Sequence, residues 1–170
     1  MPVTLDATVG GSSSNTYATL EEADAYFDAR LYASAWTSLT GTDGIETKKK
    51  ALIAAAQRND QEPLDGARAA LGQRLEWPRT GVTDRSGYSV ASTAIPEDIK
   101  IAQYETALFL LTTAKDPAVV DPLANFAAIK IGEIGITLRP TAPRTADTLP
   151  DPVLRLLAPY QPDGADFSRG

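Results

Sequence analysis

The apolar residues of this chain change their spacing near residue 117, and this change limits the folds that are open to it. Before residue 117 they recur every three or four positions, which places them on one face of a helix. Between residues 126 and 138 they alternate with other residues, which is the period of a strand. We therefore predict a mainly α fold: a small helical bundle with a projecting loop, a short β-hairpin or one long strand, and an extended C-terminal arm.

The first helix is expected to begin at Thr19. Thr19 and Glu22 have the spacing of a capping box, in which each side chain accepts a hydrogen bond from an otherwise unpaired backbone N–H group. Ala23, Phe27 and Leu31 follow at intervals of four residues, so they should form one apolar face that packs into the core.

Further helices are expected over three later segments. After a break at residues 41–44, a second long helix should run from about residue 45 to residue 59, and residues 67–75 should form a shorter helical segment. The third long helix should open near Pro96, beside acidic residues that suit a helix N-terminus, and should end near Lys115. Because its apolar face is the widest, we expect it to be the central helix of the core.

The segment between the shorter helix and the third long one should form a projecting hairpin or an ordered loop. Trp77 stands before Pro78, a position that favours extended backbone, so Trp77 should end the preceding helix. Further along, Asp84 and Gly87 occupy the first and fourth positions of a type I turn. We expect that turn to form the tip of the loop.

The strand-like stretch contains a change of parity. Ile129 and Ile131 lie two residues apart, but Ile134, Ile136 and Leu138 continue the alternation on the opposite parity. A two-residue turn at residues 132–133 explains the change, because it would pair Ile131 with Ile134 and Ile129 with Ile136 on one face. One long strand with a bulge is the alternative. An isolated hairpin is marginal in water, so these strands should need a further surface to pack on.

The remainder of the chain is expected to form terminal segments around the bundle. Residues 1–16 are rich in Gly, Ser and Thr and should be flexible or ordered by a partner. Residues 17–116 should form the helical core. Residues 117–170 should carry the β segment and a proline-rich arm whose short amphipathic helix has little to bury against locally, so this arm should dock elsewhere.

Composition argues against catalysis. The 170 residues include no histidine and no cysteine, which removes the commonest general base, the commonest metal ligand and every thiolate. Asp24 and Asp28 are spaced by four residues on the first helix, but a solvated helix face explains them better than a bound cation. We therefore expect no enzyme activity, no cofactor and no metal ion.

Charge and hydropathy argue against nucleic acid and membranes as partners. The net charge is −6, whereas nucleic-acid-binding proteins usually carry a basic patch. The cationic cluster at residues 48–50 would point in three directions from a helix. The longest strongly apolar stretch, residues 107–111, is far shorter than a membrane span. The N-terminus also lacks the pattern of a signal peptide, so synthesis in the cytoplasm is expected.

Protein–protein contacts are the remaining class of function. Arg79 and Arg85 could contact phosphates, but arginine at a protein interface is equally expected. Trp77 could stack on a base, although a buried tryptophan is the better interpretation. The residues that we select as interface candidates are Trp77, Arg79, Arg85, Tyr88, Ile129, Ile131, Ile134, Ile136, Leu138, Val153, Leu156, Leu157 and Tyr160.

Several stretches of the sequence resemble a family of tailed-bacteriophage proteins. The most specific stretch is Trp-Pro-Arg-Thr-Gly at residues 77–81, followed by Ile95-Pro96 and an Ala/Leu-rich helix. The similarity spans roughly residues 15–160. It also includes residues 17–27 with Trp36, and residues 51–55, 73–82, 131–134 and 149–160. The family is that of head-to-tail adaptor (connector, or head-completion) proteins, some of which are labelled DnaT-like single-stranded-DNA-binding proteins.

The resemblance implies a virion protein at the head-tail junction that is made in the host cytoplasm. Such proteins assemble as a ring, typically of twelve copies, below the portal protein. The ring extends the channel through which genomic double-stranded DNA passes without specific binding, and it offers a platform to a tail or nozzle protein. The alternative is a single-stranded-DNA-binding replication accessory protein. The resemblance supplies no catalytic residues.

Overall fold

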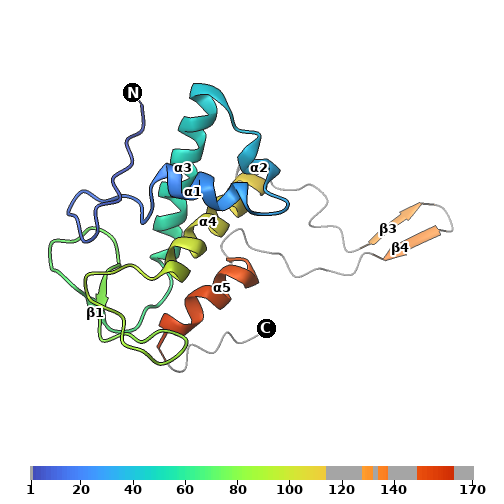
Figure 1. Ribbon diagram of the computed structural model, residues 1–170. Coiled ribbons are helices and arrows are strands. Elements are labelled where there is room, and N and C mark those ends of the chain that lie inside the picture. The colour runs from blue at the N-terminus through green and yellow to red at the C-terminus, as the bar shows by residue number, and fades with distance from the viewer. Residues whose placement is uncertain (1, 114–127, 132–133, 138–148, 163–170) are drawn as a thin grey trace.

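The computed structural model describes residues 2–113, 128–131, 134–137 and 149–162 and shows a mainly helical protein (Figure 1). Its elements follow one another in this order: α1 Leu20–Asp28, α2 Ser34–Thr37, α3 Gly41–Asn59, β1 Ala67–Arg68, β2 Arg79–Thr80, α4 Glu97–Thr112, β3 Ala128–Ile131, β4 Ile134–Thr137, α5 Asp151–Leu157 and the 3-10 turn η1 Ala158–Tyr160.

Helix α4 is the centre of the helical body, as predicted. It packs against α3, α5 and α2 (Figure 1). Ile99 and Ala102 belong to the core shared with α5, whereas Tyr104 and Leu108 belong to the core shared with α1 and α2. One helix therefore joins both halves of the apolar core.

The start of α1 is confirmed, but the end of its predicted apolar face is wrong. Thr19 caps the helix: its side chain accepts a hydrogen bond from the Glu22 N–H, and the Glu22 side chain accepts one from the Thr19 N–H. Phe27 is buried, but Leu31 is 79% exposed because α1 ends at Asp28. Tyr32 then adopts a positive φ of 60°, and the chain turns into α2.

Helix α3 begins four residues earlier than predicted. The pair Gly41 and Gly44 suggested a break, yet both glycines lie within the helix. Gly44 is needed for close packing, because a Cβ there would approach the Leu39 carbonyl carbon to 2.6 Å. The glycine thus permits a close contact between backbones instead of ending a helix.

The predicted helix at residues 67–75 is absent. Residues Ala67 and Arg68 pair instead with Thr80 and Arg79 in a two-stranded antiparallel ladder. The Gln73 side chain organises the connecting loop: its amide nitrogen donates to the carbonyls of Leu75 and Pro78, and its oxygen accepts from the Ala70 N–H. These bonds reach across the loop, so the local spacing of apolar residues does not reveal them.

The projecting loop forms as predicted. An isolated bridge joins Thr83 to Ser89, and the Gly87 N–H donates to the Asp84 carbonyl as a type I turn requires. The Asp84 carboxylate also accepts from the N–H groups of Ser86 and Tyr88. One aspartate therefore fixes the backbone of the whole tip.

The hairpin has the predicted register. Ile131 lies opposite Ile134, and Ile129 lies opposite Ile136, so the single bulged strand is wrong. In Figure 1 the hairpin stands apart from the helices. The turn at residues 132–133 and most of the predicted arm lie outside the described residues.

The short helix α5 docks on the helical body of its own chain. It packs on α4, and Val153 and Leu157 are fully buried there. Tyr160 in η1 then meets Trp77 edge to face, with ring centroids 5.2 Å apart. The apolar surface that covers α5 and η1 therefore comes from α4 and the Trp77 loop, which are distant in sequence.

The N-terminal segment lies against the helical body of the same chain. The Val3 N–H donates to the Glu46 carboxylate at 2.6 Å, and the Lys49 ammonium donates to the Val3 carbonyl at 3.0 Å. Ser14 and Thr16 are buried further along. This chain itself therefore supplies contacts that order residues 2–16. Among the helices of the described ranges, none is long and apolar enough to span a membrane.

Candidate functional site

Trp77 is a core residue in this structure. Its side chain is 2% exposed and packs against Tyr160. Its backbone N–H donates to the hydroxyl oxygen of Tyr17 at 3.4 Å. The indole therefore has no free face on which a base could stack, which agrees with the preferred interpretation of Trp77 as a buried residue.

Arg79 is also engaged within its own chain. Its Nε donates to the Asp65 carbonyl at 2.7 Å, and Nη2 donates to the carbonyls of Leu64 and Gly66 at 3.2 and 3.0 Å. Nη1 donates to the Glu76 carboxylate at 2.6 Å. Because every arm of the guanidinium is occupied, Arg79 fastens the loop after α3 and is not presented to a partner.

Arg85 and Tyr88 lie on the surface of the projecting loop. The Tyr88 side chain is 74% exposed. The Arg85 side chain is exposed and its Nη2 donates to the Arg155 carbonyl of α5 at 2.9 Å, which ties the loop to that helix. Of the candidates before residue 120, these two are the ones that the structure leaves accessible.

The candidates in α5 and η1 are mostly buried. Val153, Leu157 and Tyr160 contribute to the core, and Leu156 is half-buried beside it. The isoleucine candidates lie on β3 and β4 at facing positions, and Leu138 lies outside the described residues. The isoleucines therefore stay predicted contacts, whereas the α5 residues already serve the chain's own packing.

The lysine cluster does not form a cationic groove. Lys48 is nearly buried and donates to the Asp24 carboxylate at 2.8 Å, and that carboxylate also accepts from the Trp36 indole N–H at 2.7 Å. Lys49 pairs with Glu46 at 3.0 Å, and Lys50 is exposed. The three ammonium groups thus lie in three different environments, as their spacing on a helix predicted.

A buried carboxylate joins three segments of the chain. Asp60 accepts hydrogen bonds from the Tyr17 hydroxyl and from the Glu76 N–H. Burial raises the pKa of the Asp60 carboxyl to about 6, although these two hydrogen bonds favour its charged form. Burial likewise raises the pKa of the Tyr17 hydroxyl, and the neighbouring Asp60 charge adds to that effect. Because the Tyr17 hydroxyl and the Asp60 carboxylate are hydrogen-bonded to each other, we assign them a structural role and not a role in ligand binding.

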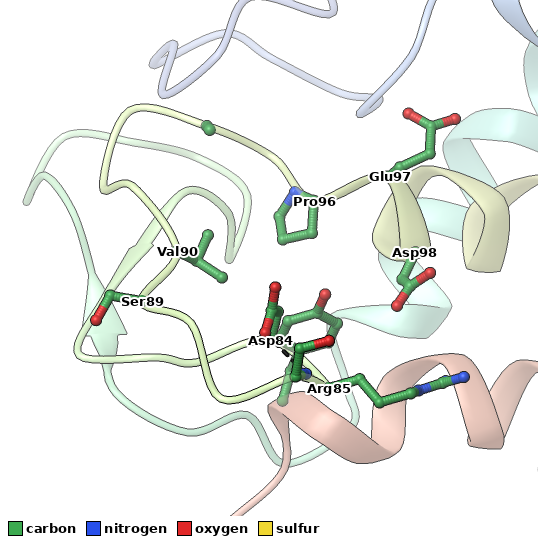
Figure 2. Close-up of a pocket in the computed structure, with 10 residues that line it drawn as sticks. Asp84, Arg85, Ser89, Val90, Pro96, Glu97 and Asp98 are labelled. Atoms are coloured by element: carbon green, nitrogen blue, oxygen red, sulfur yellow. Dashed lines mark hydrogen bonds between the residues drawn. The ribbon is translucent and has the colours of Figure 1, made fainter.

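A pocket that the sequence did not indicate lies between the projecting loop and the start of α4. Its volume is about 410 Å³ (Figure 2). The pocket is lined by Asp84, Arg85, Ser86, Ser89, Val90, Ala94, Pro96, Glu97, Asp98 and Tyr160. The acidic residues after Pro96 were attributed to helix capping alone, and nothing in the local sequence indicates that Tyr160 joins them.

The electrostatics of the pocket are negative. Burial raises the pKa of the Tyr160 hydroxyl to about 12, and the charges of Asp98 and Asp84 contribute, with Arg85 opposing them. Within the described ranges, no three Asp, Glu, His or Cys side chains gather closely enough to hold a metal ion. The pocket can therefore offer carboxylates and one hydroxyl to a ligand that carries hydrogen-bond donors.

Comparison with known proteins identifies a family. A family model described as "Putative DnaT-like ssDNA binding protein" matches residues 1–167, so the chain belongs to this family. No match was found among curated proteins or among solved structures.

Proposed function

We propose that this member of the DnaT-like family is a structural protein that works by assembly: a ring-forming head-to-tail adaptor of a tailed phage. In this role copies of the chain bind one another, the portal protein above and a tail or nozzle protein below. Genomic DNA passes through the ring without specific binding. The hairpin β3–β4 is the observation that carries the proposal.

The hairpin has strand edges that a neighbouring copy could bind. Its two strands pair with each other, and within the described part of the chain neither strand belongs to a larger sheet. A two-stranded hairpin is marginal alone, and its outer edges carry unpaired N–H and C=O groups. Addition of a strand from another chain satisfies those groups, and contacts of this head-to-tail kind close into rings.

The placement of the aromatic and cationic side chains favours a role in assembly over a role in nucleic-acid binding. Most large aromatic side chains of the helical body are buried; the exceptions with the greatest exposure are Tyr32 and Tyr88. Arg79 is enclosed by carbonyl groups, and Lys48 is held by Asp24. The net charge of −6 also disfavours tight binding of phosphates by the chain as a whole.

The second candidate function is single-stranded-DNA binding, which the description of the matching family favours. That function requires exposed aromatic residues beside a positively charged groove. On the described surface the best match is Tyr88 with the exposed Arg85 of the same loop. This pair is small and stands next to acidic side chains, so we place it second.

One experiment separates the two functions. The full chain is mixed with a cognate portal ring and imaged by electron microscopy, and the same preparation is titrated with labelled single-stranded oligonucleotide at several salt concentrations. An adaptor adds a ring of density to the portal and shows no salt-dependent affinity in the micromolar range or tighter. Oligonucleotide binding that weakens steeply with salt, without a ring on the portal, overturns the adaptor and establishes the second candidate.

A matched pair of variants tests the role of the hairpin. Replacement of residues 128–137 by a Gly/Ser segment of equal length should abolish the added ring and leave the thermal unfolding of the helical body unchanged. The control is Leu71→Ser, which alters an exposed side chain elsewhere and should leave the ring intact. A ring that still forms without the hairpin would contradict strand addition as its basis.

A further inference from the structure

The pocket beside α4 contains polar groups that the fold does not use. Asp98 is half-buried in the first turn of α4, and its carboxylate makes no hydrogen bond or ion pair with any described residue. One oxygen of Asp84 holds the tip of the loop, and the other accepts no hydrogen bond from a described residue. Figure 2 shows the two carboxylates on opposite sides of the space below Pro96.

The hydroxyl of Tyr160 completes this set. The Tyr160 side chain is 2% exposed, lines the pocket, and has no hydrogen-bond partner for its hydroxyl among the described residues. The hydroxyl is reached from the pocket, so it is free to form a hydrogen bond with a ligand that binds there. This unpartnered group lies on η1 and is independent of the acidic side chains, and it adds a hydrogen-bonding group to the pocket.

The cation of the pocket is directed elsewhere. Arg85 also lines the pocket, but it reaches along α5, where its guanidinium donates to the Arg155 carbonyl, and it forms no ion pair with Asp84 or Asp98 (Figure 2). Val90 and Pro96 add an apolar wall. Two carboxylates, a hydroxyl and an apolar wall match a side chain with an aliphatic stem and a cationic end.

We propose that the pocket between the projecting loop and the start of α4 binds an arginine side chain of a partner protein. The guanidinium carries five N–H donors in one plane, so it can bind Asp84 and Asp98 together, whereas the compact ammonium of lysine serves such a pair less well. The arginine stem packs on Val90 and Pro96. The loop tip with Tyr88 then lies next to the bound partner and adds contact area.

The test uses the acetylated amide of arginine as the probe and that of citrulline as its neutral isostere. Each is titrated into the full chain, and backbone amide shifts are followed by NMR. Arginine should produce saturable shifts in residues 84–90 and 96–99, and citrulline should not. Equal shifts with both probes, or no saturation with arginine, would overturn the proposal.

Two substitutions connect the signal to the pocket. Asp98→Asn should weaken arginine binding roughly ten-fold, because a hydrogen bond to a charged group is lost. Asp151→Asn is the matched control: it removes the same charge from an exposed position in the first turn of α5 and should leave the affinity unchanged. An equal loss in both variants would mean that general negative charge attracts the probe, and the specific site would be rejected.

A third variant tests the hydroxyl without changing charge. Tyr160→Phe should weaken arginine binding several-fold and retain the packing against Trp77. The spectrum of each unliganded variant reports whether its fold is intact. An intact Tyr160→Phe protein with wild-type affinity would exclude the hydroxyl from the site, and an unchanged Asp98→Asn protein would refute the pocket altogether.

Discussion

Replacement of Asp60 by asparagine should remove a pH-dependent part of the folding stability. The pKa of this carboxyl is raised from its ordinary value of 3.8 to about 6. Since the folded state holds the proton more tightly than the unfolded state, protonated Asp60 stabilises the fold. That contribution is fully present below the unfolded pKa and is lost as the pH rises through about 6. The displacement of the pKa corresponds to about 3 kcal/mol.

The assay is urea unfolding of both proteins at a series of pH values. Other carboxylates, such as Glu22 and Glu46, have lowered pKa values and oppose the effect in each protein, so the difference between the two curves is the informative quantity. The wild-type protein should lose about 2 kcal/mol relative to Asp60→Asn between about pH 4 and about pH 7. Asp65→Asn, at an exposed position, is the matched control. Parallel curves for wild type and Asp60→Asn would refute the reasoning.

Two further substitutions test buried polar contacts. Gln103→Leu should destabilise the protein by about 3 kcal/mol in urea unfolding, because the Tyr17 N–H and the Leu52 carbonyl both lose their buried partner; a loss below about 1 kcal/mol would contradict this. Arg79→Lys should cost about 2 kcal/mol, since an ammonium cannot reach all the carbonyls that the guanidinium binds; a wild-type melting temperature would show that these bonds contribute little.

Features whose cause is local could be predicted from the sequence. The capping box needs only Thr19 and Glu22 three residues apart, and the structure contains it. The pairing of Ile131 with Ile134 followed from the change of parity, because a strand that alternates must keep its apolar residues on one face. In both cases the residues that determine the structure lie within a few positions of one another.

Features that depend on distant contacts could not be predicted in the same way. Residues 67–75 have an apolar spacing compatible with a helix, yet Gly66 and Thr80 approach so closely that a Cβ at Gly66 would lie 2.1 Å from the Thr80 carbonyl oxygen. This close contact accompanies the pairing of Ala67 and Arg68 with Thr80 and Arg79, which replaces the predicted helix. The surface that buries α5 lies on α4, about fifty positions earlier in the chain. The pocket likewise combines Asp84, Asp98 and Tyr160, and no short motif contains all three.

The two proposals depend on different chemistry and on different parts of the chain. The adaptor rests on the open edges of β3 and β4, where backbone groups offer hydrogen bonds without regard to charge. The arginine site rests on side chains that α4, η1 and the projecting loop hold in place. A ring with a functional hairpin could therefore form even if the pocket bound nothing. Conversely, arginine binding at Asp98 would establish an acidic recognition site even for a protein whose main ligand proved to be single-stranded DNA. Since a site of two carboxylates repels phosphate, single-stranded DNA would have to bind elsewhere on the chain.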